Sequence, residues 1–301
     1  MSIFEAIVLG LVQGLTEFLP ISSSGHLILV PWLVGWDEPG LAFDAALHLG
    51  TLLAVFAYFW RELLGMLLAV PTALSRPREL LQMEPPAAVE GLRPVSGGST
   101  SGREWDARLA LLLIVGSIPG GVLGLIFQGK IDDFFHAESH RPFSIVVIAL
   151  LLMGFALLLW WADRVAVHRR GIESLTVRDT VVIGSAQALA LMPGVSRSGS
   201  TLTAGLFRGL RREDAARFSF LLGVPLTTAA ALTGVKDILD ASPSGHEVTT
   251  MIVGIAVSAV TGFAAIWTLL RLLQRHSAAI FVVYRVAVGL LVLGLIAAGV
   301  R

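Results

Sequence analysis

The sequence predicts an all-α integral membrane protein with six transmembrane helices and two re-entrant helical hairpins, arranged as an inverted-topology repeat. Three observations support this prediction: the composition, the recurrence of long apolar stretches, and a similarity between the two halves of the chain. Of the 301 residues, 55% are hydrophobic and 15% are charged, whereas soluble domains carry about 25% charged residues. Most of the chain is therefore expected to lie in lipid, which agrees with a mean hydropathy of +0.78.

Six apolar stretches are long enough to cross a bilayer, which takes about 20 helical residues. We expect these spans at 43–60, 108–127, 143–161, 217–234, 250–270 and 280–300. Two further apolar segments, 1–30 and 180–206, are interrupted by Pro, Gly and Ser. The start of the chain has neither the basic region nor the cleavage site of a signal peptide, so we expect it to belong to the mature fold. Cysteine is absent and the formal net charge is zero, so disulfides are excluded and nothing indicates a nucleic-acid partner.

Basic residues are distributed unevenly among the connections. Seventeen of the 22 lie in the segments 61–108, 162–178, 208–217 and 271–285, and four lie in the other connections or at the C-terminus. Cytoplasmic loops of membrane proteins carry the excess of Arg and Lys, which places these four segments inside. Both ends of 180–206 then face the cytoplasm, and both ends of 1–30 face outside. Each is therefore predicted to be a re-entrant hairpin, and both termini are expected outside the cytoplasm.

The two hairpin segments resemble each other. A shift of 174 positions pairs identical residues: Gly10 with Gly184, Gln13 with Gln187, Leu15 with Leu189, Ser22 with Ser196, Ser24 with Ser198 and Gly25 with Gly199. Three spans follow each hairpin, and an odd number of crossings inverts the second copy. We expect one membrane domain built from a first repeat at 1–161, with a polar cytoplasmic loop at about 61–107, and a second repeat at 180–301. In such repeats the broken segments meet near the midplane and form the binding site.

The first hairpin carries an unusual set of polar side chains. Glu17 is followed by Ser22, Ser23, Ser24, Gly25 and His26 in an otherwise apolar segment. Ionisable groups in a membrane are costly and mark functional sites by default. The structural alternative is a neutral, hydrogen-bonded Glu17 and a His26 that only supports the fold.

The second hairpin contains the complementary charge. Arg197 is the one basic residue outside the loops and termini assigned above. A guanidinium offers a planar fork of donors suited to phosphate. Around it stand the small and hydroxyl residues Ser196, Ser198, Gly199, Ser200 and Thr201, at the expected start of a helix, where backbone N–H groups favour anions. The structural alternative is an Arg197–Glu17 ion pair that holds the hairpins together, but this pair does not explain the row of hydroxyls.

Three further polar residues are candidates for a supporting role. Gln13 lies one helical turn before Glu17, and Asp44 and His48 lie one turn apart near the start of the first span. Asp44 and His48 fit either a contact behind the site or a solvated helix end, since polar groups are tolerated at the interface.

These motifs together resemble the bacterial undecaprenyl-diphosphate phosphatases, a family of integral membrane enzymes associated with bacitracin resistance. The resemblance rests on Gln13-x-x-x-Glu17 with the following Phe-Leu-Pro-Ile-Ser-Ser-Ser-Gly-His26, on Phe43-Asp-Ala-Ala-Leu-His-Leu-Gly-Thr51, and on Pro193-Gly-Val-Ser-Arg-Ser-Gly-Ser-Thr201. It covers nearly the whole chain. It implies hydrolysis of undecaprenyl diphosphate to undecaprenyl phosphate and inorganic phosphate, in the bacterial inner membrane, with bacitracin competing for the lipid substrate.

The resemblance also implies roles for individual residues. Glu17 matches the essential acid, Ser23 and His26 match the loop residues, and Ser196, Arg197 and Thr201 match the phosphate-binding motif. A divalent cation, Mg²⁺ or Ca²⁺, is implied as cofactor, with Glu17 as its one candidate ligand. Gln13 stands where many family members have a first Glu, so the resemblance does not extend to a second carboxylate at this position.

The sequence leaves the order of chemical events open. Ser23 is the candidate nucleophile, activated by Glu17 or His26, and a water activated by Glu17 is the alternative. His26 is expected to protonate the leaving oxygen or to support a metal. Arg197 would hold the phosphoryl group, with Ser22, Ser24, Gly25 and the 196–201 segment as further phosphate contacts, near the outer face of the membrane.

Two wider questions also stay open. A transporter or flippase for a phosphorylated lipid or anion is the alternative function, because inverted repeats with broken helices are a transporter architecture. The oligomeric state is open as well, a homodimer included.

Overall fold

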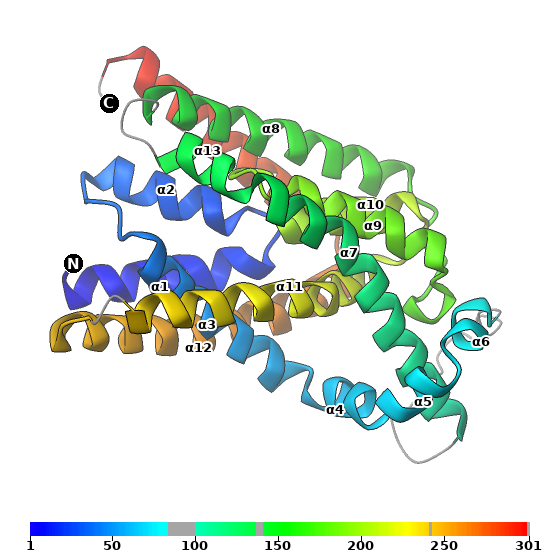
Figure 1. Ribbon diagram of the computed structural model, residues 1–301. Coiled ribbons are helices and arrows are strands. Elements are labelled where there is room, and N and C mark those ends of the chain that lie inside the picture. Colours follow the sequence, from blue (N-terminus) through cyan, green and yellow to red (C-terminus); the bar gives the residue numbers. More distant parts are fainter. Residues whose placement is uncertain (84–99, 137–140, 241–242, 300–301) are drawn as a thin grey trace.

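The computed structural model describes residues 1–83, 100–136, 141–240 and 243–299, and every regular element in these ranges is a helix. The N-terminal half contains α1 (Ile3–Phe18), α2 (Ser23–Val34), α3 (Leu41–Tyr58), α4 (Trp60–Leu68), α5 (Val70–Ser75), α6 (Pro77–Gln82), α7 (Thr100–His136) and α8 (Arg141–Val165). The C-terminal half contains the short 3₁₀ helix η2 (Ile172–Ser174), then α9 (Val177–Leu189), α10 (Arg197–Phe207), α11 (Arg212–Asp240), α12 (Gly245–Arg275) and α13 (Ala279–Ala297). Figure 1 shows the long helices lying roughly side by side.

The predicted all-α membrane fold is confirmed. Within the described ranges, six helices are long and apolar enough to cross a membrane: α3, α7, α8, α11, α12 and α13. They coincide with the six expected spans, although α7 and α11 extend beyond them. The extensions are polar, since α7 begins before Arg103 and α11 begins at Arg212. A helix continues past the hydrocarbon boundary because its backbone hydrogen bonds are satisfied internally in either medium.

The described parts of the connection expected at about 61–107 are helical. Short helices α4, α5 and α6 follow α3 directly, and α7 already begins at Thr100. A small apolar cluster of Ala69, Ala73, Leu80 and Ala107 holds these helices against α7. Pro71 and Pro77 lie at the starts of α5 and α6, where a proline fits a helix without losing a hydrogen bond. The middle of the expected loop, 84–99, lies outside the described residues.

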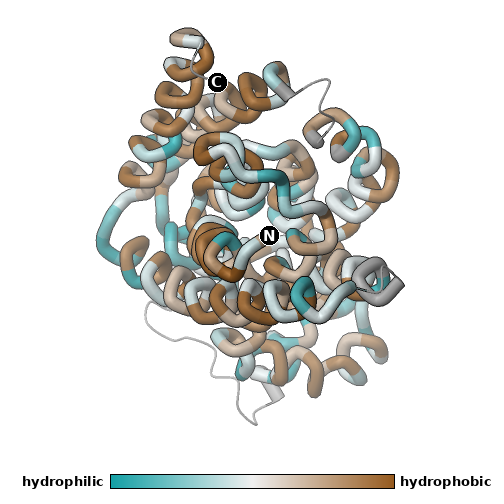
Figure 2. Tube along the Cα trace, turned by 90° about the vertical axis from the view of Figure 1, so that its left-hand side faces the viewer, coloured by the Kyte–Doolittle hydropathy of each residue, from teal (hydrophilic) through white to brown (hydrophobic). Residues whose placement is uncertain are grey.

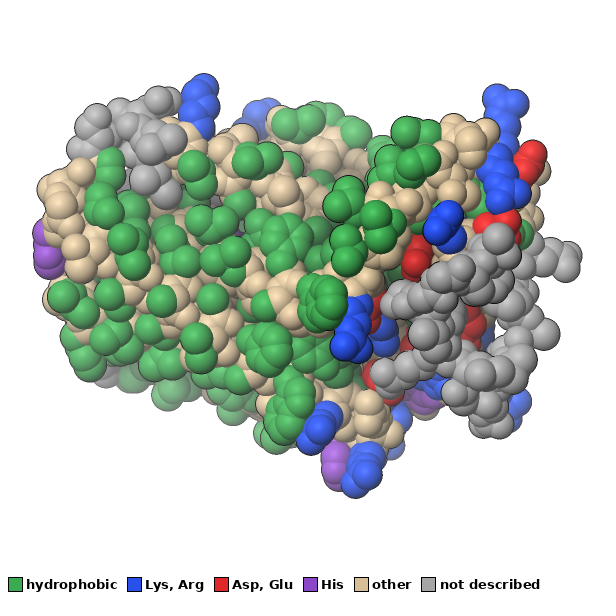
Figure 3. All heavy atoms as spheres, turned by 90° about the horizontal axis from the view of Figure 1, so that it is seen from below, with side chains coloured by type: hydrophobic (Ala, Val, Ile, Leu, Met, Phe, Trp, Pro, Cys, Tyr) green, Lys and Arg blue, Asp and Glu red, His purple; other side chains and the backbone are tan. Residues whose placement is uncertain are grey.

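The apolar side chains face outward, as they do in a protein surrounded by lipid. Leu125 is 92% exposed and Val260 is 71% exposed, although both lie within spans. Figure 2 views the bundle from the end that carries the termini and shows hydrophobic segments all around its perimeter. Figure 3 shows apolar side chains covering most of one long side of the molecule. Exposed patches of this size are rare on soluble monomers.

Charged side chains gather at the end of the molecule opposite to the termini. Figure 1 places the N- and C-termini at one end and α4 to α6 at the other, and Figure 3 shows most of the visible basic and acidic side chains at that second end. Three Arg side chains there stack on neighbouring Trp rings, in the pairs Arg61–Trp60, Arg164–Trp160 and Arg271–Trp267. Trp and Arg are typical anchors at a membrane interface. We call this the Arg-rich end.

Two buried carboxylates form ion pairs with Arg side chains from other segments at the Arg-rich end. Asp179 accepts hydrogen bonds from Arg170 at 2.6 Å and Arg208 at 2.5 Å, and Asp163 accepts from Arg212 at 2.5 Å. Burial alone would raise the pKa of the Asp179 carboxyl, but its hydrogen bonds from Arg170, Thr176 and Arg208 hold that pKa below the usual range. Asp179 is therefore a carboxylate that joins the connection after α8 to the end of α10.

Each predicted hairpin segment folds as two helices joined by a tight turn, α1 with α2 and α9 with α10. Figure 1 shows the pairs extending inward from opposite ends of the molecule. Each turn ends in a Ser with positive φ, 76° at Ser22 and 73° at Ser196, and these are two of the three such non-glycine residues in the described ranges. Both Ser side chains cap the following helix by accepting from Gly25 N–H and Gly199 N–H respectively. Two strained residues 174 positions apart, with the same cap, support the predicted repeat.

The packing of the hairpins crosses between the two halves of the chain. Helix α1 packs along α12, and α9 packs along α7. The second contact is backbone to backbone, because a Cβ on Gly184 would lie 1.9 Å from the Gly116 carbonyl oxygen. The inverted orientation of the repeats within a membrane, and re-entry of the hairpins into it, stay predictions.

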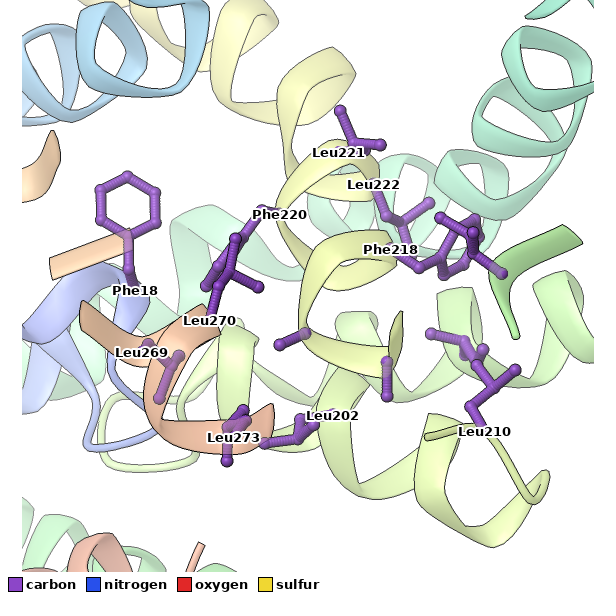
Figure 4. Close-up of a cluster of buried hydrophobic side chains, with 14 of the residues drawn as sticks. Phe18, Leu202, Leu210, Phe218, Phe220, Leu221, Leu222, Leu269, Leu270 and Leu273 are labelled. Atoms are coloured by element: carbon purple, nitrogen blue, oxygen red, sulfur yellow. The ribbon is translucent and has the colours of Figure 1, made fainter. Parts of the chain in front are cut away.

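The largest apolar cluster lies around the end of α1 and joins it to α11 and α12. Figure 4 shows Phe18 beside Phe220, Leu269 and Leu270. The rings of Phe18 and Phe220 meet edge to face at 5.4 Å between centroids. Because Phe18 directly follows Glu17, this packing fixes the backbone that presents the carboxylate.

Candidate functional site

Glu17 is the centre of a buried polar cluster at the meeting point of the two hairpins. Its side chain is 7% exposed. One carboxylate oxygen, Oε1, accepts a hydrogen bond from Arg197 at 2.8 Å, and the other, Oε2, accepts from the Ser23 hydroxyl at 2.6 Å. The structure therefore unites three of the four predicted catalytic residues around one carboxylate.

Ser23 and Arg197 reach Glu17 from equivalent places. Ser23 is the first residue of α2 and Arg197 is the first residue of α10, and the two are 174 positions apart in the chain. Each follows the strained Ser that caps its helix. The pair thus lies at two helix N-termini, where the backbone dipole favours negative charge.

Gln13 and His48 surround the same carboxylate. Gln13 is fully buried, and its amide donates to Glu17 Oε2 at 3.2 Å. His48 Nε2 lies 3.8 Å from that oxygen, and the other ring nitrogen contacts the Asp44 carbonyl at 2.8 Å. His48 is thus placed beside the site, with Asp44 orienting its ring through the backbone. The Gln13 Oε1 atom is buried without a hydrogen-bond partner in the structure.

Most of the predicted phosphate-binding hydroxyls hold the turns together. Ser22 Oγ accepts a hydrogen bond from the backbone N–H of Gly194 at 3.0 Å, and Ser198 Oγ donates to the Leu19 carbonyl at 3.0 Å. Each hairpin is therefore hydrogen-bonded to the turn of the other. The hydroxyls of Ser200 and Thr201 donate to the Arg197 carbonyl, and Thr201 also meets Ser219 Oγ at 2.5 Å. Ser24 is half-buried beside Ser23. Contact of these groups and of Gly25 and Gly199 with phosphate stays a prediction.

The contacts of His26 lie to the side of this cluster. Its Nδ1 is 2.7 Å from the Ser22 carbonyl oxygen and its Nε2 is 2.9 Å from the Tyr284 hydroxyl. Because a carbonyl can only accept, Nδ1 carries a proton and Nε2 accepts from Tyr284 in the neutral ring. His26 therefore supports the first turn in this structure, and its predicted role as an acid would require Tyr284 to give way.

A narrow pocket opens beside Glu17 and Arg197. Its walls come from α3 and α11: Thr51, Leu52, Val55, Phe220, Gly223, Val224 and Thr227. The close approach of Arg197 to α11 depends on Gly223, since a Cβ there would lie 1.9 Å from Arg197 NH1. A polar floor with apolar walls suits a charged head group attached to an apolar tail.

Sequence reasoning missed Arg285. It was assigned to the 271–285 connection, so Arg197 was described as the one basic residue outside loops and termini, and that description is wrong. Arg285 lies within α13 and is 0% exposed. A signal was present, because the expected span 280–300 already contained this residue. Arg108 was likewise assigned to a connection, and the structure buries it inside α7.

Comparison with known proteins identifies the family of this chain. The family model described as bacitracin resistance protein BacA matches residues 6–291. The chain belongs to the BacA family. It is 46% identical over 293 residues to an undecaprenyl-diphosphatase of Thermomicrobium roseum, covering 97% of this chain and 98% of the relative.

Other BacA family members are similarly close. An undecaprenyl-diphosphatase of Moorella thermoacetica is 44% identical, with 97% of both chains covered. A protein named undecaprenyl-diphosphatase 2, of Stutzerimonas stutzeri, is also 44% identical, covering 97% of this chain and 98% of the relative. The BacA family match therefore reaches from within the first hairpin into the sixth span, which agrees with the nearly complete coverage of the motif resemblance.

Proposed function

We propose that this BacA family protein hydrolyses undecaprenyl diphosphate to undecaprenyl phosphate and inorganic phosphate, which recycles the carrier lipid for cell-wall synthesis. The observation that carries the proposal is the Glu17 carboxylate, bonded at once to a hydroxyl nucleophile and to a guanidinium. A base, a nucleophile and an anion-binding group within one buried cluster are the parts that phosphoryl transfer needs. The names of the relatives supply the substrate.

The contact between Ser23 and Glu17 supports covalent catalysis. At 2.6 Å, Ser23 Oγ donates its proton toward Glu17 Oε2, which is the arrangement of a nucleophile and its general base. In this mechanism Ser23 Oγ forms a bond to the terminal phosphorus, and the bond to the bridging oxygen breaks. The proton passes to Glu17, undecaprenyl phosphate leaves, and water then cleaves the phosphoserine. Attack by a water that Glu17 activates is the alternative.

Arg197 is proposed to change partners when substrate binds. In the structure its NH2 group donates to Glu17 and its NH1 group donates to the Ser219 carbonyl at 3.3 Å. A diphosphate entering the pocket carries more negative charge than a single carboxylate and offers oxygens that match the fork. The Arg197–Glu17 ion pair, which the sequence suggested as a purely structural link, is present in the structure. In the proposed mechanism this pair also holds Arg197 in position for the phosphoryl group.

A divalent cation fits this site as a partner of the substrate. Among the described residues no group of three or more His, Cys, Asp or Glu side chains surrounds a common point. Mg²⁺ commonly binds one or two carboxylates together with substrate phosphates. The carboxylate oxygens of Glu17 and the Oε1 atom of Gln13, which has no hydrogen-bond partner in the structure, would hold the cation. The cation would neutralise charge on the diphosphate.

The orientation in the bacterial inner membrane is part of the proposal. The Arg-rich end faces the cytoplasm, both termini face outside, and the site lies toward the outer face. A single cysteine at Ser2, in a chain without native cysteine, is expected to react with an impermeant thiol reagent in intact cells. A cysteine at Ser75, at the Arg-rich end, should react only after the membrane is opened. The reverse pattern would overturn this orientation.

Phosphate release in detergent tests the function directly. Purified protein in detergent micelles with Mg²⁺ is expected to release one inorganic phosphate per undecaprenyl diphosphate, leaving undecaprenyl phosphate. Micelles have no compartments, so transport cannot produce this signal. An inactive Glu17→Gln preparation is the control for contaminating phosphatases. Substrate binding without phosphate release would favour the transporter alternative, which the named relatives do not support.

A further inference from the structure

Arg285 is a buried cation for which the mechanism above has no use. It lies in α13 next to Tyr284, and no ion pair identified among the described residues involves it. A guanidinium held in a low dielectric without a carboxylate is strongly disfavoured unless other groups replace its hydration. Its presence therefore calls for a specific set of partners.

Those partners are backbone carbonyls of both turns. NH1 donates to the Pro20 carbonyl at 3.2 Å, in the turn between α1 and α2. NH2 donates to the Gly194 carbonyl at 2.9 Å and the Val195 carbonyl at 3.1 Å, in the turn between α9 and α10. The remaining nitrogen, Nε, donates to the Leu152 carbonyl of α8 at 3.0 Å.

The carbonyls that accept hydrogen bonds from Arg285 lie two or three positions before the functional residues in the chain. Pro20 is three positions before Ser23, and Val195 is two positions before Arg197. Because the fork of one guanidinium is rigid and planar, it fixes the separation of the two turns as well as their orientation. Tyr284 adds a further contact from the same stretch of α13 by donating to His26.

We infer that Arg285 is a positioning residue for phosphoryl transfer: it holds the two turns in register so that Ser23 and Arg197 converge on one phosphoryl group. It does not touch the substrate, because it is fully buried behind the turns and all three of its nitrogens are bonded to carbonyls. This inference rests on the proposed function, since it requires that the converging groups carry out the reaction.

The test compares two substitutions at Arg285 with one at Arg108. Arg285→Lys keeps the charge and loses the fork, whereas Arg285→Gln removes the charge and keeps two N–H donors. Arg108→Lys is the matched control, because Arg108 is also buried but donates to the Leu175 carbonyl, away from the turns. Each protein is purified as a monodisperse peak in detergent, its thermal midpoint is measured, and kcat and KM for undecaprenyl diphosphate are determined well below that midpoint.

Both Arg285 variants are expected to lose kcat on the order of 10²-fold, the cost of a displacement near 1 Å at a reacting centre, with little change in KM. Arg108→Lys is expected to lower the thermal midpoint and keep the wild-type kcat. A role in stability alone predicts the same behaviour for Arg285 as for Arg108, and that result would overturn the inference. A raised KM with normal kcat would overturn it too, by showing a purely electrostatic effect on binding.

Failure of the proposed function and failure of this inference would give different results. Failure of the wild-type protein to release phosphate would count against the function itself. Failure of both Arg285 variants to yield a folded peak would make Arg285 a folding residue and would also overturn the inference.

Discussion

Phosphate release by Ser23→Ala is expected to fall to the same residual level as that of Glu17→Gln. Alanine has no oxygen with which to form a phosphoserine, so loss of the hydroxyl removes the covalent route entirely. Glu17→Gln is nearly isosteric but cannot accept the Ser23 proton, and loss of a general base costs on the order of 10²–10⁴-fold. Initial rates of both variants would be measured beside wild type, in the same detergent and with the same metal.

The control for this comparison is Ser185→Ala. Ser185 lies on the exposed side of α9 and donates only to the Val181 carbonyl, one helical turn back. The same chemical change there is expected to leave turnover intact. Turnover by Ser23→Ala well above that of Glu17→Gln would rule out the covalent mechanism. Glu17 would then be the base for an attacking water.

Arg197→Lys is expected to lose most of the activity while the protein still folds, on the order of 10²-fold in kcat/KM for a misplaced contact at the reacting group. Lysine keeps the charge but loses the planar fork, which bonds Glu17 and the Ser219 carbonyl in the structure and would bind phosphate. Gly223→Ala on α11 would displace the Arg197 guanidinium, because the added Cβ would lie 1.9 Å from its NH1 and 2.6 Å from its Cζ. We expect a similar loss, and kcat/KM of each purified variant would measure it.

Combining the two substitutions shows whether Gly223 acts through Arg197. Lysine has no NH1 group to collide with the new Cβ, so Gly223→Ala should cost little when position 197 is already Lys. Gly154→Ala on α8 is the control, because nothing lies within 4 Å of its added Cβ. Full additivity of the two losses would mean that Gly223→Ala disturbs α11 generally. Near-normal turnover of Arg197→Lys would remove Arg197 from the phosphate site.

The sequence carried the information for the spans because each is a continuous apolar run. It also indicated Glu17, Ser23 and Arg197, because polar groups in lipid are rare enough to be conspicuous. Their convergence on a single carboxylate could be anticipated only through the repeat, which pairs position 23 with position 197. The copy is incomplete, however, since Leu191 stands at the position that corresponds to Glu17. One acid therefore serves both turns.

Other features could not be read from residue type. A serine in a turn looks the same whether its hydroxyl caps a helix or faces a ligand, and Ser22 and Ser196 both cap. Arg285 was missed because counting charges for each connection does not show whether a residue near its end already belongs to the following helix. The short helices α4 to α6 were missed because their apolar faces are small and the segment between α3 and α7 is interrupted by prolines.

The packing of α1 along α12 constrains the order in which the protein can be assembled during synthesis. Helix α1 is made first, but the surface that it covers on α12 appears only after more than two hundred further residues have been translated. Until then the first hairpin lacks its main packing partner, and Glu17 lacks Arg197. The N-terminal hairpin therefore reaches its final packing only after α12 has been made, although it leaves the ribosome much earlier than α12. Because α9 packs on α7, which is already in place, the C-terminal hairpin finds its partner as soon as it emerges.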